Sequence, residues 1–378
     1  MPTFSDTLQQ LRLSGNLRHI PKPGSGAHCI DLSSNDYLGL ASRPELQEEF
    51  MASASNRMTP LTASASRLLA AGQSDFYALE ELLADLYGRS VLLFNSGYHA
   101  NVGTVSAIAS EGTMILADKL VHASIIDGIV LSRAKFARFS HNDTAHLVRL
   151  LEKHASEYER VLVVVESAYS MDGDCCDLDA LINLRERYPN MVLYVDEAHA
   201  FGVLGDKGLG MVQSHPHSEK VDIVIGTLGK AAASSGAFVA TRPDIREFLV
   251  NRARSFIFST AIPPMVCRWS RFLIEKITGM DAERTRLRDI TRTMAGILAP
   301  YSSAPVEPSH IMPMIVGDAT RTVELSQKLL QHGVKVLPIR TPTVPPGTER
   351  LRFSLCAALT DSDLQRVADA LTATLHPL

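Results

Sequence analysis

Short, almost purely apolar runs alternate with helical patterns through the middle of the chain, from about Ser90 to Ala240. The run SVLLFN precedes HANVGTVSAIAS, TMILAD precedes ASIIDGIVLSRA, VLVVVES precedes DLDALINLRERY, and MVLYVDE follows. A strand that is buried on both faces shows continuous rather than alternating apolar character, and repeated strand-helix units favour parallel pairing. The pattern therefore predicts an α/β fold built on a mainly parallel sheet.

The two ends of the chain carry different patterns. The first 20 residues, MPTFSDTLQQLRLSGNLRHI, predict a short amphipathic helix. After Pro263 and Pro264 the sequence changes to a long helix, MVCRWSRFLIEKITGM, followed by IMPMIVGD, a further helix, VKVLPI and RLRFSLC. We therefore expect a helical N-terminal arm in residues 1–40, a large domain in residues 41–275 and a smaller α+β domain in residues 276–378.

Composition narrows the class of protein but does not identify a partner. The 378 residues include 37 basic and 41 acidic side chains without a basic run, so charge gives no reason to expect nucleic acid or an acidic membrane surface. The five cysteines lack the paired spacing of a zinc or redox motif. Without a signal peptide or a long apolar run, the sequence predicts a soluble protein of the reducing cytoplasm.

Polar residues that directly follow the apolar runs are the candidate site residues, because open α/β sheets bind ligands at the carboxyl ends of their strands. Ser96 and Gly97 precede a helix whose free N–H groups could hold a phosphate. The candidates after the later runs are His122, Ser170, Asp196, His199, Thr227 and Lys230. Their spacing matches no metal motif, so we expect no metal site.

Each candidate taken alone also has an ordinary structural explanation. An aspartate after a strand is often a helix cap, a single histidine is often structural, and SG before a helix is a common turn. Lys230 is the exception, since the small residues of GTLGKAAASSGAF give its charge little to pair with locally. Such surroundings would lower the pKa of the amine, as imine-forming lysines require.

Nine segments in the same order resemble the α-oxoamine synthases, a family of fold type I enzymes that depend on pyridoxal 5'-phosphate (PLP). They are LSSNDYLGLAS, LLFNSGYHAN, VHASIIDG, RFSHND, ESAYSMDGD, VDEAHAFGVLGDKGLG, GTLGKA, FIFSTAIPP and GTERLRFSL. The resemblance implies a PLP-dependent transferase fold: a mainly parallel, seven-stranded central sheet with helices on both faces, and a smaller α+β C-terminal domain. It also implies a decarboxylative condensation of an amino acid with an acyl thioester.

The resemblance assigns roles to individual residues. Lys230 would hold PLP as a Schiff base, Asp196 would bind the ring nitrogen, and His122 would stack on the ring. The other implied cofactor contacts are His199 and Ser170 near the ring and Gly97, Tyr98 and Thr227 at the phosphate, with Ser259 and Thr260 similar to residues that the partner subunit contributes. The implied substrate contacts are Arg18, Asn35 and Arg352, of which Arg352 would clamp the substrate carboxylate. The resemblance therefore also implies a homodimer with its active site at the subunit interface.

The segment IRTPTVPPGTERLR is most similar to those family members that join L-alanine to a pimeloyl thioester, carried by coenzyme A or an acyl carrier protein, in biotin biosynthesis. Other members use glycine with acetyl-CoA, or serine with a long acyl-CoA. An aminotransferase on the same fold, and a PLP-fold protein without turnover, are more distant alternatives.

The sequence departs from the family pattern at several positions. TASASR, residues 62–67, stands where the family usually has GSGGSR, and Ala233 and Ala237 occupy positions that are often glycine. Val121 stands where several relatives have asparagine, and Tyr77 where they often have histidine. Because alanine and serine restrict the backbone more than glycine does, we expect the geometry of the substrate mouth to differ.

Overall fold

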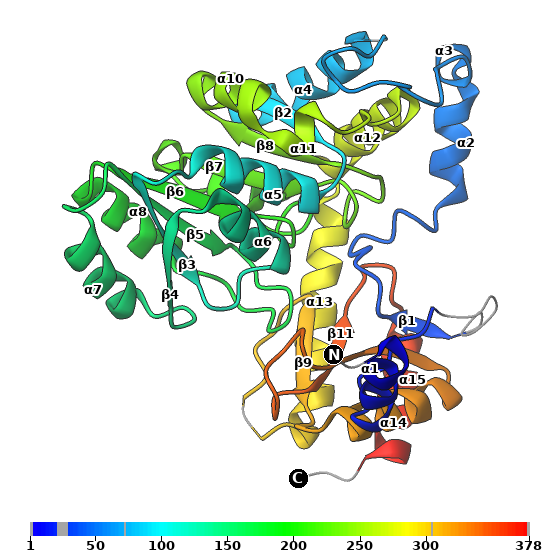
Figure 1. Ribbon diagram of the computed structural model, residues 1–378. Coiled ribbons are helices and arrows are strands. Elements are labelled where there is room, and N and C mark those ends of the chain that lie inside the picture. The colour runs from blue at the N-terminus through cyan, green and yellow to red at the C-terminus, as the bar shows by residue number, and fades with distance from the viewer. Residues whose placement is uncertain (1–2, 21–28, 72, 304, 376–378) are drawn as a thin grey trace. The chain divides into compact units, whose positions relative to one another are not determined.

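The computed structural model describes residues 3–20, 29–71, 73–303 and 305–375 (Figure 1). The chain divides into two compact units. The larger unit contains Leu38–Tyr169 and Cys175–Asp281, and the smaller unit contains Met1–Tyr37, Ser170–Asp174 and Ala282–Leu378. The sequence patterns gave no sign that Ser170–Asp174 groups with the two ends of the chain.

A seven-stranded sheet forms the centre of the larger unit (Figure 1). Its strands are β2 (Ser90–Phe94), β3 (Thr113–Asp118), β4 (Lys135–Phe139), β5 (Arg160–Glu166), β6 (Met191–Asp196), β7 (Ile223–Thr227) and β8 (Ala237–Thr241). They lie in the order β2-β8-β7-β6-β5-β3-β4, and all neighbours pair in parallel except β8, which is antiparallel to β2 and β7. This confirms the predicted mainly parallel sheet.

Both sets of alternating side chains on these strands are buried. Leu162 and Val164 of β5 point to one face of the sheet and join a core that includes Val105 of helix α5 (Gly97–Ile108) and Ile125 of helix α6 (Ala123–Ser132). Val163, between them in the sequence, points to the other face and is also buried. The continuous apolar runs in the sequence therefore reflect a sheet that is covered on both faces.

In the described part of the larger unit, four helices begin at a polar side-chain cap. The helices of this unit are α2 (Pro44–Ala52), α3 (Ala54–Arg57), α4 (Gln73–Tyr87), α5 (Gly97–Ile108), α6 (Ala123–Ser132), α7 (Thr144–His154), α8 (Leu178–Arg187), α9 (Gly210–Gln213), α10 (Pro243–Arg252), α11 (Arg254–Ile257) and α12 (Pro264–Ile277), with 3-10 turns at Asp206–Gly208 and Ser218–Lys220. Side chains of Ser96, His122, Asp143 and Asp177 accept hydrogen bonds from backbone N–H groups at the starts of α5, α6, α7 and α8. These four helices thus start at a polar residue in the loop that follows a strand.

The smaller unit is built on a four-stranded sheet in the order β1-β10-β11-β9. Its strands are β1 (Ile30–Leu32), β9 (Ile311–Ile315), β10 (Val334–Ile339) and β11 (Arg350–Ser354), and its helices are α1 (Phe4–Leu13), α13 (Asp281–Leu298), α14 (Ala319–Gln331) and α15 (Asp361–Thr374), with a 3-10 turn at Ala299–Tyr301. The sequence predicted the later strands, but not that β1 pairs in parallel with β10.

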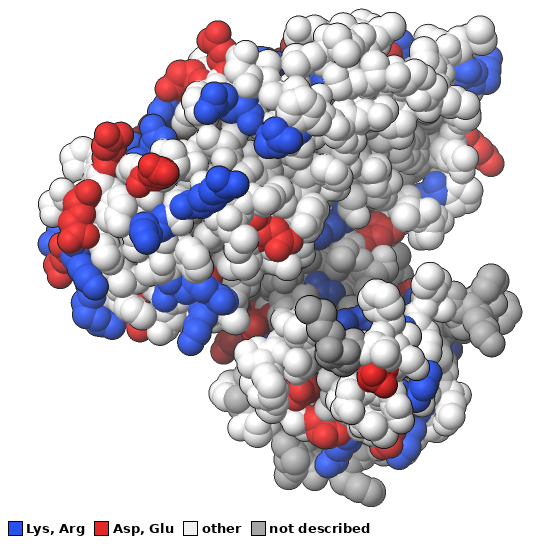
Figure 2. All heavy atoms as spheres, viewed as in Figure 1, with Lys and Arg blue, Asp and Glu red and all other residues white. Residues whose placement is uncertain are grey.

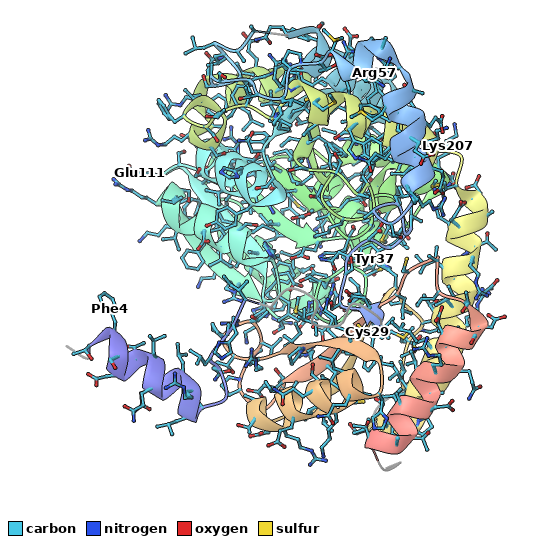
Figure 3. All side chains as sticks on the ribbon, turned by 90° about the vertical axis from the view of Figure 1, so that its right-hand side faces the viewer. Phe4, Cys29, Tyr37, Arg57, Glu111 and Lys207 are labelled. Atoms are coloured by element: carbon cyan, nitrogen blue, oxygen red, sulfur yellow. The ribbon has the colours of Figure 1, made fainter. Side chains whose placement is uncertain are left out.

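Helix α1 confirms the predicted N-terminal helix, and a capping box between Thr3 and Asp6 closes its first turn. None of its residues is buried, and Phe4 is 93% exposed at its beginning (Figure 3). Within the described part of the chain, no helix is both long and apolar enough to span a bilayer. On the face of the larger unit shown in Figure 2, basic and acidic side chains are interspersed.

Glu197, directly after β6, is a fully buried carboxyl group in the larger unit. Its Oε1 accepts hydrogen bonds from the backbone N–H groups of Met211 (2.7 Å) and Val212 (3.1 Å), while Oε2 has no hydrogen-bond partner among the described residues. Burial raises the pKa of Glu197 to about 7, against the lowering effect of the two N–H donors. The folded chain therefore retains a proton on Glu197 at pH values where the unfolded chain has lost it.

As the pH rises from 4.5 to 7, we expect the free energy of unfolding to fall less in Glu197→Gln than in wild type. A folded-state pKa above the unfolded value means that the free energy of unfolding falls as pH rises through this window, by up to about 3 kcal/mol for this group. Urea unfolding at pH 5.5 and 7.5 measures the difference, with Glu111→Gln at an exposed glutamate as the control (Figure 3). An unchanged pH dependence in Glu197→Gln would contradict the assignment.

Candidate active site

Lys230 and His199 meet in the larger unit, although they lie on different loops. Lys230 Nζ is 2.8 Å from His199 Nε2, and His199 is buried. His199 follows β6 in the DEAHA segment, and Lys230 follows β7, so parallel pairing of these neighbouring strands brings their carboxyl-end loops together. The amine predicted from the sequence thus has an imidazole beside it.

The small residues around Lys230 are required by close packing. The Cβ of an alanine at Gly202 would lie 2.6 Å from the Ala231 Cβ, so the loop after β6 and the loop after β7 touch at this point. A Cβ at Gly226 would lie 2.1 Å from the ring of Phe238 on the adjacent strand. Larger side chains at these positions would push the lysine loop away from His199.

Asp196 ends β6 and is only 3% exposed. Its Oδ2 accepts a hydrogen bond from Asn101 Nδ2 (2.7 Å), and its Oδ1 accepts one from the backbone N–H of Ala198 (2.8 Å). Asn101 lies on α5, one helical turn after Gly97, and was not among the candidate residues predicted from the sequence. The spacing of four residues from Gly97 is the signal that places both residues on the same face of α5.

His122 caps α6 and is solvent-accessible. Its Nδ1 lies 2.8 Å from Ser124 Oγ, and its backbone N–H donates to Glu166 Oε1 (2.5 Å). Partial desolvation by the surrounding protein lowers the pKa of His122, the charge of Lys230 lowers it further, and the charge of Asp196 opposes both. Glu166, also missed from the sequence, is buried, and burial together with the Asp196 charge raises its pKa well above the usual range.

The beginning of α5 presents free hydrogen-bond donors. Ser96 caps the helix by accepting from the His99 N–H (3.2 Å), whereas the backbone N–H groups of Gly97 and Tyr98 have no acceptor among the described residues. A Cβ on Gly97 would lie 3.7 Å from Thr227 Oγ1, so Gly97 and Thr227 are neighbours. The Tyr98 hydroxyl donates to Asp127 (2.7 Å) on α6.

These groups fit PLP. Two unpaired N–H donors at a helix N-terminus suit a phosphate dianion, a buried carboxylate at Asp196 suits a protonated ring nitrogen, and Lys230 supplies the amine. Among the described residues, no group of three or more His, Cys, Asp or Glu side chains is arranged to bind a metal. The residues that could hold PLP in the larger unit are Gly97, Tyr98, His122, Asp196, His199, Thr227 and Lys230.

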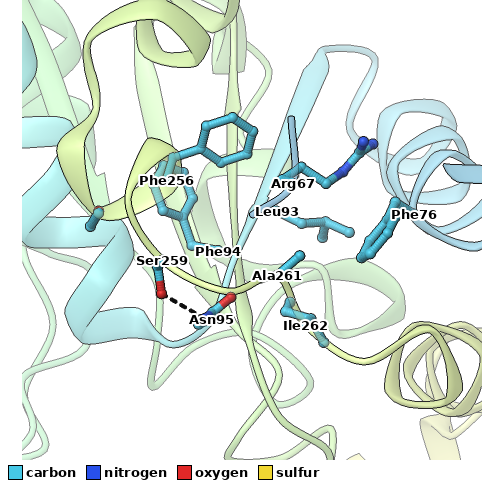
Figure 4. A pocket seen from close by; sticks show the side chains of 10 residues that line it. Arg67, Phe76, Leu93, Phe94, Asn95, Phe256, Ser259, Ala261 and Ile262 are labelled. Atoms are coloured by element: carbon cyan, nitrogen blue, oxygen red, sulfur yellow. Dashed lines mark hydrogen bonds between the residues drawn. The ribbon is translucent and has the colours of Figure 1, made fainter. Parts of the chain in front are cut away.

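Ser259 lines a small pocket of the larger unit (Figure 4). Asn95, the residue after β2, donates to Ser259 Oγ (3.0 Å) and to the Thr260 carbonyl oxygen. Arg67 lines the same pocket, and its guanidinium lies over the rings of Phe76 (4.5 Å) and Tyr77 (5.0 Å). The ring of Tyr77, a residue that the sequence left unexplained, therefore makes a cation–π contact with Arg67.

Arg352 is buried in the smaller unit, where it is 2% exposed. Its Nε donates to the Ser170 carbonyl oxygen (2.5 Å), and Nη1 and Nη2 both lie 3.2 Å from Asn35 Oδ1. Nη1 also donates to Ser354 (2.5 Å) and Nη2 to Tyr37 (3.4 Å). Within the described residues no carboxylate pairs with Arg352, so its charge lacks a counter-ion of the chain's own.

Three predicted residues, Ser170, Asn35 and Arg352, thus come together in the smaller unit. Arg18 lies in the same unit and donates to Thr343 Oγ1 (3.2 Å). It is close enough to Arg340 to lower the pKa of that guanidinium, after burial, which is the larger cause. Arg340 donates to the carbonyl oxygens of Gly15 (2.5 Å) and Leu17 (3.4 Å) and was not singled out from the sequence.

Two departures from the family pattern retain a glycine-like backbone. Ser64, in TASASR, has φ of 53°, and Ala233 has φ of 45°, both in the left-handed region that favours glycine. The Thr62 hydroxyl accepts a hydrogen bond from the Ser64 N–H (3.1 Å) and so supports the first of these turns. Val121 is buried. Replacing glycine has therefore kept the left-handed conformation at both positions, at the cost of backbone strain.

Almost the whole chain is similar to known proteins. A family model described as "Aminotransferase class I and II" matches residues 27–371. A putative 8-amino-7-oxononanoate synthase of Pasteurella multocida is 46% identical over 89% of this chain and 88% of its own, and one of Glaesserella parasuis is 45% identical over 98% of this chain and 100% of its own.

Solved structures show the same similarity. Serine palmitoyltransferase from S. paucimobilis, with bound PLP and myriocin, has a TM-score of 0.88 and 28% identity over 97% of this chain and 96% of its own. An 8-amino-7-oxononanoate synthase from Francisella tularensis has a TM-score of 0.73 and 27% identity over 92% of this chain and 98% of its own.

We expect Gly202→Ala to weaken PLP retention, because its Cβ would separate the loops that carry His199 and Lys230. Gly88→Ala is the matched control: Gly88 also has a positive φ (62°, against 86° at Gly202), but a Cβ there would meet nothing within 4 Å. The overpacking should cost Gly202→Ala roughly 1–3 kcal/mol beyond the control. Urea unfolding and the absorbance of bound PLP measure both effects, and equal losses in the two variants would exclude loop contact as the cause.

Proposed function

Because the chain belongs to the aminotransferase class I and II family, among its PLP-dependent α-oxoamine synthases, we propose that it is an 8-amino-7-oxononanoate synthase. The proposed reaction joins L-alanine to a pimeloyl thioester, releases carbon dioxide and the free thiol, and belongs to biotin biosynthesis. The observation that carries this choice of substrates is the full-length similarity to relatives of that name.

The arginines of the smaller unit support the proposed substrates. Arg352, without a carboxylate of the chain to pair with, would bind the carboxylate of alanine. A pimeloyl group ends in a second carboxylate, which acetyl and palmitoyl groups lack. The neighbouring cations Arg18 and Arg340 are suited to that distal carboxylate, whereas they would gain nothing from an uncharged acyl chain.

PLP, when bound, supplies an electron sink that allows the Cα–H bond of an amino acid to ionise. The chain's residues then divide the work. Lys230 would remove the Cα proton at Nζ, and His199, 2.8 Å away, would hold that amine in place. Asp196 would accept the hydrogen bond of the ring nitrogen, while His122 would cover the ring face and limit the access of water.

We propose the remaining roles on the family resemblance. Gly97, Tyr98 and Thr227 would bind the phosphate, and the Ser170 hydroxyl and His199 would contact the ring region. Ser259 and Thr260 would complete the site of a second copy of the chain, which makes the enzyme a homodimer with its active sites at the subunit interface. The expected location is the cytoplasm, and the expected donor is pimeloyl-CoA or a pimeloyl carrier protein.

We expect PLP-loaded protein to release thiol from pimeloyl-CoA in the presence of L-alanine. The assay pairs L-alanine, glycine or L-serine with pimeloyl-, acetyl- or palmitoyl-CoA, and Lys230→Ala serves as the inactive control because the proton acceptor is missing. Turnover with serine and palmitoyl-CoA would instead favour the activity named for the S. paucimobilis neighbour. Exchange of the amino group without thiol release would identify an aminotransferase.

We expect Arg18→Ala to raise KM for pimeloyl-CoA about tenfold, the effect of losing one charge-assisted contact, and to leave KM for L-alanine unchanged. Arg12→Ala, at an exposed arginine of α1, is the control for altered charge near the N-terminus. Steady-state kinetics with each substrate varied in turn measures the split. A change in both KM values, or in neither, would remove Arg18 from the acyl site.

A further inference from the structure

Two residues assigned to the cofactor, Asp196 and His122, are joined by a buried chain of side chains. Asn101 Nδ2 donates to Asp196 Oδ2 at 2.7 Å and to Ser124 Oγ at 2.9 Å. Ser124 Oγ in turn lies 2.8 Å from His122 Nδ1. Asn101, Ser124 and Asp196 come from α5, α6 and β6, and all three are at most 3% exposed.

The orientation of the Asn101 amide is fixed by its partners. Asp196 Oδ2 accepts a hydrogen bond from Asn101 Nδ2, so the NH2 group of Asn101 faces Asp196. Tyr194, buried on β6 two residues before Asp196, donates its hydroxyl hydrogen to Asn101 Oδ1. Both amide hydrogens and the amide oxygen therefore have partners, and a flipped amide would place Asn101 Oδ1 against Asp196 Oδ2 in place of the N–H donor.

The same hydrogen bonds determine which ring nitrogen of His122 carries the proton. The backbone N–H of Ser124 donates to His122 Nδ1 (3.2 Å), and an N–H cannot act as an acceptor. Nδ1 is therefore unprotonated, and its lone pair accepts from both the Ser124 N–H and the Ser124 hydroxyl. This use of the hydroxyl hydrogen leaves the Ser124 oxygen to accept from Asn101. The proton of the neutral imidazole consequently lies on Nε2.

We propose that Asn101 is a positioning residue for the cofactor: its single amide holds the carboxylate of Asp196 and, through Ser124, the Nε2-protonated tautomer of His122. Asn101 acts through these two residues rather than by touching PLP itself. The proposal uses the cofactor and the assigned roles of Asp196 and His122, and it is independent of which amino acid and acyl thioester react.

Other charged groups act on the same residues and must be kept constant in a test. The charges of Asp196, Lys230 and Asp127 all act on His122, and Glu166 lies beside Asp196 across the β5–β6 pair. None of them is altered by replacing Asn101 with leucine, which has a similar volume and no hydrogen-bonding atoms. Thr104 provides a control three residues further along α5, since its hydroxyl is fully buried and has no hydrogen-bond partner in the described structure.

The experiment compares wild type with Asn101→Leu and Thr104→Val, each prepared without cofactor and then titrated with PLP. We expect Asn101→Leu to bind PLP about 10- to 100-fold more weakly, the range for loss of a hydrogen bond to a buried charged group. We also expect the pH midpoint of the bound-cofactor absorbance to rise, because a loosely held Asp196 stabilises a protonated ring nitrogen less. Thr104→Val should match wild type in both readouts.

The proposal would be overturned if Asn101→Leu had the PLP affinity and the absorbance midpoint of wild type. It would also be overturned if Thr104→Val changed both quantities as much as Asn101→Leu does. Thermal unfolding of the cofactor-free proteins identifies a variant that fails to fold. In that case Tyr194→Phe decides, because it removes only the hydroxyl that orients the Asn101 amide. A shift of the absorbance midpoint in the same direction supports the proposal, and an unshifted midpoint refutes it.

Discussion

Parallel pairing of β5, β6 and β7 is the constraint on which the site depends. In this register Glu166 lies opposite Asp196, and Asp196 lies opposite Ile225. The three strands therefore end at the same edge, and the loops that follow β6 and β7 carry His199 and Lys230 to each other. A shift of one residue in either pair would turn Asp196 to the opposite face of the sheet and separate it from Asn101.

The same pairing places the buried carboxyl groups of Asp196 and Glu166 side by side. Their hydrogen-bond partners differ. Asp196 receives two hydrogen bonds, from Asn101 and from the Ala198 N–H. Glu166 receives one from the backbone of His122, and burial raises its pKa, which favours its protonated form. The raised pKa of Glu166 limits the negative charge that the two neighbouring carboxyl groups carry, at the place where we propose that the ring nitrogen binds.

The sequence predicted those parts of the fold and site that local pattern specifies. Apolar runs marked the strands, so the residues at their ends, such as Asp196 and Lys230, could be found without a structure. Asn101 and Ser124 could not, because they lie within helices, where a polar residue usually faces solvent, and their contacts join separate elements. The three residues of β1 are too few for a periodic pattern, and the contact between Gly202 and Ala231 depends on how two loops meet.

The pairing of β1 with β10 has a consequence for how the chain is made. Ile30 pairs with Val334, so a strand that leaves the ribosome early must wait for one that is synthesised near the end. The larger unit, almost all of it between Leu38 and Asp281, lies between them in the sequence and can fold while the chain is still growing. Strand β1 therefore stays without its sheet partner until residues 334–336 of β10 have been synthesised. Helix α1 precedes β1 in the sequence and has no buried residue, which suits a segment that is exposed to water until β10 is made.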